Sequence, residues 1–365
     1  MKKLNYLFCI LSLSFVLIFV LIGCKNEKTG VIEYDLAGVI EYDLDGYEYH
    51  IELSKNKEAC FYIPSNGKEI NIPEEITVKH GMFSEKYIIN EIYFDYDFYA
   101  NGEDLDPNCL KTNIIVPKTV SSIRKKGFGK YTYAKFNNED IDFFVSNVGG
   151  ISVVNDNPYF DSREDSNCII ETKTDKIIIS GLKNTKIPST VKEIGSFAFW
   201  YIDYTELTEL IIPSNVKKID SFAFIGNDYL HRLIIEEGVE EIEPYAFLDT
   251  TVFYEGRFDC PINELYIPST LKKLSTNSFY MYDMNGSTNI YYNGSDFDSL
   301  IYDKYTGDDV SKGIGLTKPN NGDAYFELTG NENIFRANIY LYSEKEPETD
   351  GNYWHYVDGN IQAWE

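Results

Sequence analysis

Four consecutive segments of the chain share one apolar pattern with constant internal offsets. Each has an isoleucine that we take as position 0: Ile187, Ile212, Ile235 and Ile267. Aliphatic residues follow it at the fourth and seventh positions, and a phenylalanine stands at the twelfth. The spacing between segments varies, although the offsets do not. This combination is typical of a solenoid, in which each coil buries its apolar side only against neighbouring coils and insertions leave at one edge.

The offsets also indicate how the chain runs within a coil. Position 0 and the residue two before it share one face of a strand, so both can point into the core. Proline follows position 0 in three segments, and since it lacks a backbone donor we expect the strand to end there. Proline also argues against amphipathic helices. We expect the four phenylalanines to stack in a ladder: Phe199, Phe224, Phe247 and Phe279.

The pattern extends beyond these four segments. The same offsets occur upstream at Val116 and Val120, and alternation at Ile151 and Val153 indicates a further strand. Residues 155–185 are then an insertion, and two apolar runs that flank a polar turn within it predict a hairpin.

The consensus L-x-x-L-x-I-P-x-x-V-x-x-I-x-x-x-A-F resembles the BspA-type class of bacterial leucine-rich repeats. Residues 157–172 and 342–359 are also similar to segments common in these proteins. The resemblance implies a β-rich leucine-rich repeat solenoid with short parallel strands and turns. It also implies a surface protein that binds other molecules, but a shared fold does not identify the ligand.

The N-terminus has the features of an export signal. Lys2 and Lys3 precede a long apolar run, and Leu21-Ile22-Gly23-Cys24 resembles a bacterial lipobox. The resemblance implies cleavage before Cys24 and a lipid on its thiol. A run of this length could instead remain as a membrane helix.

These features predict a linear domain order. We expect a lipoprotein signal peptide at 1–23; a tether at 24–45, where GVIEYDL occurs twice and a short strand pair is the alternative; an N-terminal β-rich cap at 46–110; the solenoid at 111–294, with inserts at 155–185 and 250–261; and a C-terminal tail and cap at 295–365.

Charge and motifs exclude several classes of function. The formal net charge of −25 disfavours nucleic acid and anionic lipid as partners, because both need clustered lysine and arginine. No catalytic motif and no Cys/His zinc spacing is present, so we expect neither an enzyme nor a cofactor. Four cysteines beyond the lipobox are expected to be buried free thiols: Cys60, Cys109, Cys168 and Cys260.

Acidic clusters that contain Asp95 and Asp97, and Asp296 and Asp298, are candidate calcium ligands. Neither cluster fits the EF-hand spacing, so ordinary acidic loops are the alternative.

The residue before position 0 should point outward from each strand. Stacked coils would then align an apolar row of Ile211, Ile234, Tyr266 and Tyr291. A charged row of Glu209, Arg232 and Glu264 should run beside it. An exposed apolar row often marks a contact surface, although isoleucine and tyrosine also favour strands in general.

Three functions remain open on these grounds. The first is a lipid-anchored surface protein, facing the outside of the bacterial membrane, that binds a protein or glycan of a host, a neighbouring cell or the envelope without catalysis. The second is a structural spacer of the envelope. The third is a hydrolase that acts on wall or host polymers.

Overall fold

The computed structural model describes residues 31–34, 39–44, 47–63, 69–94, 112–125, 148–181, 185–199, 208–224, 227, 230–247, 262–274, 276–279, 288–297, 300 and 337–364. Within these ranges the chain forms β-strands and two 3-10 turns, with no α-helix. No helix there is long and apolar enough to span a membrane. The predicted signal peptide and Cys24 lie outside these ranges. The chain divides into two compact units, which we describe separately.

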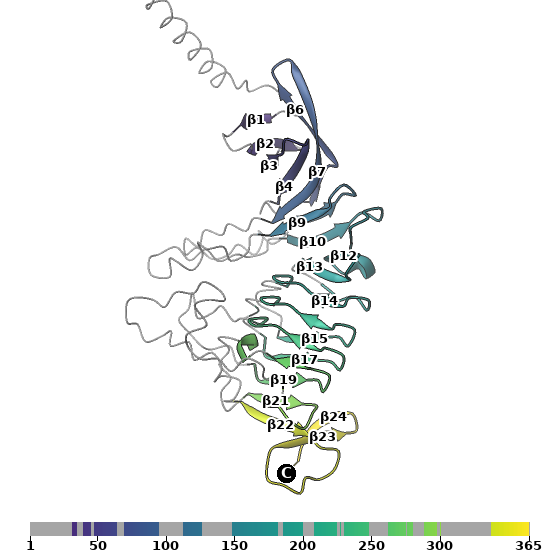
Figure 1. Ribbon diagram of the computed structural model, residues 1–365, viewed down its shortest axis with the longest axis vertical. Helices are drawn as coiled ribbons and strands as arrows, with labels where there is room; N and C mark the ends of the chain where they lie inside the picture. The colour runs from purple at the N-terminus through teal and green to yellow at the C-terminus, as the bar shows by residue number, and fades with distance from the viewer. Residues whose placement is uncertain are drawn as a thin grey trace, which may run out of the picture. The chain divides into compact units, whose positions relative to one another are not determined.

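The first unit contains one seven-stranded sheet in the order β1-β2-β3-β4-β7-β6, with β9 paired to β7 (Figure 1). Neighbouring strands are antiparallel, except that β7 runs parallel to β4 and to β9. The strands are β1 (Val31–Tyr34), β2 (Val39–Leu44), β3 (Tyr47–Leu53), β4 (Glu58–Tyr62), β6 (Glu75–His80), β7 (Phe83–Phe94) and β9 (Ser122–Lys125).

The duplicated heptapeptide belongs to this sheet. Its two copies form β1 and β2, which pair antiparallel, and β2 continues the pairing to β3. Of the two alternatives for residues 24–45, the structure therefore has the short strand pair at 31–34 and 39–44, because the alternating apolar and polar residues of VIEYDL suit a strand with one buried face. Ile40 is buried in that face.

The second unit begins with a three-stranded parallel sheet in the order β10-β8-β5. It consists of β5 (Glu69–Asn71), β8 (Thr112–Val116) and β10 (Val148–Val153), which align Ile70, Ile114 and Ile151. The expected boundary at residue 110 is therefore wrong. β5 lies within the region expected as a cap but belongs to the second unit. β9 lies within the region expected as solenoid but belongs to the sheet of the first unit. The long β6–β7 hairpin follows β5 in the chain and interrupts the repeat spacing there.

Residues 168–180 form the hairpin that the sequence predicted, with β12 (Cys168–Glu171) antiparallel to β13 (Lys176–Ser180). This hairpin, edged by β11 (Phe160–Asp161), starts a ladder of very short parallel strands. The strands that follow in it are β14 (Glu193–Ile194), β16 (Lys218–Ile219), β18 (Glu241–Ile242) and β20 (Lys273–Leu274). Each contains the residue seven after position 0, and the sequence did not predict that these residues form strands. The two 3-10 turns are η2 (Arg163–Asp165) and η3 (Thr276–Phe279).

A second ladder contains the strands predicted at position 0. It consists of β15 (Glu209–Ile212), β17 (Arg232–Ile235), β19 (Glu264–Ile267), β21 (Asn289–Tyr292), β22 (Asn338–Tyr342), β23 (Tyr353–Val357) and β24 (Asn360–Ala363). From β15 to β23 neighbouring strands are parallel, and β24 turns back antiparallel (Figure 1). β15 and β19 end at position 0, directly before Pro213 and Pro268, as predicted.

The core lies between the two ladders. The aliphatic residues of positions 0, four and seven in the coils from Ile212 onward are all buried. The predicted phenylalanine ladder is confirmed, because Phe199, Phe224, Phe247 and Phe279 stack successively with ring centroids 4.9, 4.9 and 5.1 Å apart.

A second aromatic stack, which the sequence did not predict, lies two residues earlier in each coil. Phe197, Phe222 and Tyr245 stack at 5.3 and 5.5 Å. Their φ angles of 57°, 61° and 61° are uncommon for aromatic residues. The repeated turn therefore has a left-handed residue in each coil, held in place by the stack.

We predict that Phe224→Ala destabilises the second unit by about 3–5 kcal/mol, because it leaves a cavity in the middle of the ladder. Urea unfolding monitored by circular dichroism measures this change. Tyr159→Ala is the control, since Tyr159 is 50% exposed, and it should shift stability by no more than about 0.5 kcal/mol. Equal stability of the two variants would contradict a core built on this ladder.

Candidate binding face and pocket

The apolar row is aligned by strand pairing. Ile211, Ile234, Tyr266 and Tyr291 are successive partners across β15, β17, β19 and β21, and Tyr340 of β22 extends the row. Ile211 is 46% exposed and the others are half-buried. The Tyr266 and Tyr291 rings stack at 5.0 Å, and those of Tyr291 and Tyr340 at 5.2 Å. The row presents aliphatic surface at one end and tyrosine faces at the other.

The charged row is held together by ion pairs within itself. Arg232 forms ion pairs with Glu209 at 2.5 Å and with Glu264 at 2.9 Å, and its guanidinium lies 5.2 Å from the centre of the Tyr266 ring. The Tyr266 hydroxyl donates to Glu264 at 2.8 Å. Burial first, and then this hydrogen bond, raises the pKa of Tyr266 to about 12. These contacts hold the Tyr266 ring in place.

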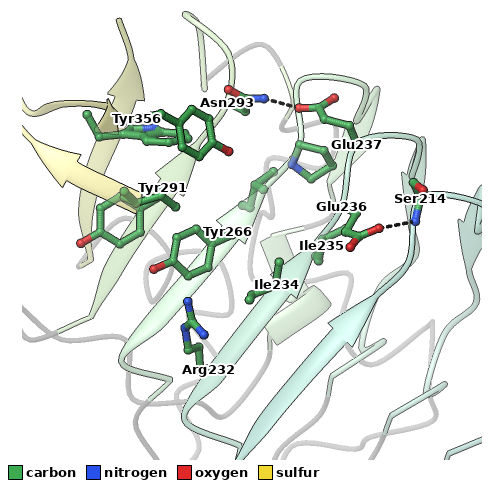
Figure 2. A pocket seen from close by; sticks show the side chains of 14 residues that line it. Ser214, Arg232, Ile234, Ile235, Glu236, Glu237, Tyr266, Tyr291, Asn293 and Tyr356 are labelled. Carbon is green, nitrogen blue, oxygen red and sulfur yellow. Dashed lines mark hydrogen bonds between the residues drawn. The ribbon is translucent and has the colours of Figure 1, made fainter. Parts of the chain in front are cut away.

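Three members of the row line a pocket of about 380 Å³ (Figure 2). Its floor includes Ile234, Tyr266 and Tyr291 of the sheet. One wall comes from the C-terminal strands and the other from the coil edge that follows position 0. Those walls contain Trp354, Tyr356 and Ile361 on one side, and Ser214, Glu236, Glu237 and Asn293 on the other.

Trp354 holds the C-terminal wall against the sheet. It is 2% exposed, and its indole N–H donates to the Tyr292 carbonyl at 3.0 Å. Its ring also meets Tyr291 edge-on at 6.1 Å. Tyr356, two residues further along β23, is 54% exposed. The buried tryptophan thus positions an exposed aromatic ring beside the row.

The coil edge supplies two carboxylates. Glu237 accepts hydrogen bonds from the Ser269 and Thr270 backbone N–H groups at 2.7 and 3.2 Å, and also from the Asn293 amide. Burial tends to raise the pKa of Glu237, but these hydrogen bonds outweigh it and hold the pKa below its ordinary value of 4.5. One oxygen of Glu236 accepts from the Ser214 N–H at 2.9 Å.

Of the residues predicted for the binding face, the structure brings Arg232, Ile234, Tyr266 and Tyr291 together in the pocket. Glu264 on β19, and Glu209 and Ile211 on the neighbouring strand β15, lie outside it. Sequence reasoning missed Tyr356, Glu236 and Glu237. The signal for the two glutamates was their place directly after Ile235, whereas nothing in the sequence paired Tyr356 with β19 and β21.

The apolar row begins one coil later than the four-segment repeat. Residues 185–188 form no strand, so the coil of Ile187 contributes no partner for Ile211, and Lys186 is simply exposed.

The remaining candidates show no site within the described residues. Asp296 is exposed, and Asp95, Asp97 and Asp298 lie outside the described ranges. Nowhere within those ranges do three potential metal ligands converge.

Two of the four cysteines can be placed. Cys60 and Cys168 are buried free thiols, as predicted, and burial is the main cause that raises the pKa of each to about 12. Cys109 and Cys260 lie outside the described ranges.

Residues 178–285 match the BspA type leucine-rich repeat region in six copies. The segment that contains the phenylalanine ladder and most of the binding face is therefore a BspA-type leucine-rich repeat array. A search of curated proteins finds no match.

Three solved structures are similar. The pneumococcal vaccine antigen PcpA is 13% identical, with a TM-score of 0.33 over 85% of this chain and 95% of PcpA. A leucine-rich repeat protein from Bacteroides ovatus is 15% identical (TM-score 0.29), covering 76% of this chain and 66% of that one. Another, from Eubacterium ventriosum, is 15% identical (TM-score 0.25), covering 50% and 36%.

We predict that Glu237→Gln destabilises the second unit at neutral pH. The substitution replaces a carboxylate that accepts several hydrogen bonds with a neutral amide, which accepts them less strongly. The folded-state pKa is lowered, so this stabilisation is present above pH 4.5 and is lost as the pH falls through the folded-state value. The difference in unfolding free energy between wild type and variant should therefore shrink on acidification below pH 4.5. Glu348→Gln, at an exposed position, is the control. A pH-independent difference would contradict the assignment.

Proposed function

We propose that this chain is a lipid-anchored protein of the bacterial cell surface that binds a protein or glycan without catalysing a reaction. The observation that carries the proposal is the apolar row, a line of isoleucine and tyrosine side chains, three of which line a pocket. Solenoids commonly use such sheet faces for binding.

The composition of the face supports a recognition role. Aromatic and arginine side chains are enriched at the centres of protein interfaces, where Arg232, Tyr266, Tyr291 and Tyr356 would fit. The rings of Tyr266 and Tyr291 already stack on each other, so these side chains lose little conformational freedom on binding. BspA-type proteins are typically associated with the bacterial surface, which agrees with the predicted lipobox.

The proposal is tested by screening the full chain against matrix proteins, mucins, wall glycans and whole cells. Ile211→Ser combined with Ile234→Ser should weaken a binder found in this way by about tenfold, as expected for residues at an interface centre. Ile88→Ser is the matched control, because Ile88 is 50% exposed but belongs to the first unit. A circular dichroism melt confirms that both variants fold. Equal binding by both would contradict the proposed face.

The lipid anchor has its own test. In a bacterial host, Cys24→Ser should release the protein from the membrane fraction, because the acyl chains that hold it there are lost. Cys9→Ser, a cysteine within the apolar run, should leave it membrane-bound. Mass spectrometry of the N-terminal peptide should detect acylated Cys24 in the wild type. Membrane retention of Cys24→Ser with residues 1–23 intact would instead indicate a membrane helix.

A further inference from the structure

The pocket has aromatic faces and an excess of negative charge. Tyr266, Tyr291 and Tyr356 lie around the same space in Figure 2. Arg232 lies at the far end from Glu237, and its charge is already balanced by Glu209 and Glu264. Glu236 and Glu237, by contrast, have no ion-pair partner among the described residues, although ion pairs flank the same coil at Arg232–Glu264 and Lys272–Glu240.

Glu237 is a fixed charge. Hydrogen bonds to both of its oxygens hold it in position and keep it ionised at neutral pH, so it creates a steady negative potential at the pocket edge. Glu236 uses one oxygen for the Ser214 N–H. Its second oxygen has no hydrogen-bond partner among the described residues and is available to a ligand.

We infer that the pocket binds the cationic side chain of a basic protein partner, an arginine or a lysine. This inference rests on the proposed function and specifies its ligand. A cation inserted here would lie against tyrosine faces, which attract it through their ring quadrupoles. It would also reach the open oxygen of Glu236 and the field of Glu237. A guanidinium fits best, since it stacks on aromatic rings and donates to carboxylates in one plane.

Charge favours this occupant over a glycan. The chain has a formal net charge of −25, which attracts a basic partner and repels sialylated or sulfated sugars. A neutral sugar needs hydrogen-bond donors as well as acceptors. Two donors of the pocket are already engaged, since the Tyr266 hydroxyl donates to Glu264 and the Asn293 amide donates to Glu237. The volume of about 380 Å³ is near the lower limit for ligand pockets, about 300 Å³, which suits one or two side chains.

The test measures binding of a fluorescein-labelled peptide, in which arginines are spaced by Gly-Ser, to the full chain in mild detergent. The comparison peptide carries citrulline, which has the shape of arginine but no charge. We expect the citrulline peptide to bind about tenfold more weakly, and binding of the arginine peptide to weaken as salt is raised.

Two variants locate the binding. Glu236→Gln keeps an acceptor for the Ser214 N–H but removes the charge, and Tyr356→Ala removes an exposed ring. Each should weaken the arginine peptide by about fivefold. Asp156→Asn and Tyr159→Ala are matched controls, because both residues are exposed and lie away from the pocket lining. Neither control should change binding.

Three results would overturn the inference. They are equal binding of the arginine and citrulline peptides, no binding of the arginine peptide, and loss with Tyr356→Ala but not with Glu236→Gln, accompanied by binding of a neutral oligosaccharide. None of these refutes the proposed binding function, which fails if the double substitution of Ile211 and Ile234 leaves partner binding unchanged.

Discussion

Stacking between coils is the constraint on which the rest of the second unit depends. A single coil has no core of its own, because the ring of Phe224 packs between those of Phe199 and Phe247 in neighbouring coils. The backbone hydrogen bonds of the short strands likewise join one coil to the next. Repetition of this contact puts equivalent residues into register, and it does so on both faces of each strand. The inward rows form the core, whereas the outward rows are free to vary for binding.

That register explains what could be predicted from the sequence. Once Ile212 and Ile235 are recognised as equivalent, the alignment of Ile211 with Ile234 and of Phe224 with Phe247 follows. Features outside the repeat could not be predicted in this way. The coil that contains Ile70 was missed because the β6–β7 hairpin separates it from the next copy, although Ile72-Pro73 has the position-0 signal. The Tyr356 wall was missed because it comes from a segment with no repeat pattern, which a buried tryptophan attaches to Tyr292.

The candidate site combines both kinds of feature. The repeat provides an apolar row beside a charged row, in which Arg232 forms ion pairs with two glutamates. The C-terminal strands and the coil edge then add an aromatic wall and two carboxylates that no described cation balances. A surface of the first kind provides contact area with little chemical preference. The pocket adds preference for charge, which is why the class of ligand can be argued from the structure.

Partners are proposed to bind at the row and pocket of the second unit. Hydroxyl-radical footprinting of the full chain, with and without a partner obtained from the binding screen, locates the contact surface. We expect Ile211 and Tyr356 to become protected from oxidation in the complex, while exposed side chains elsewhere, such as Met82 and Tyr159, react as before. Protection of Met82 or Tyr159, with Ile211 and Tyr356 unchanged, would contradict it.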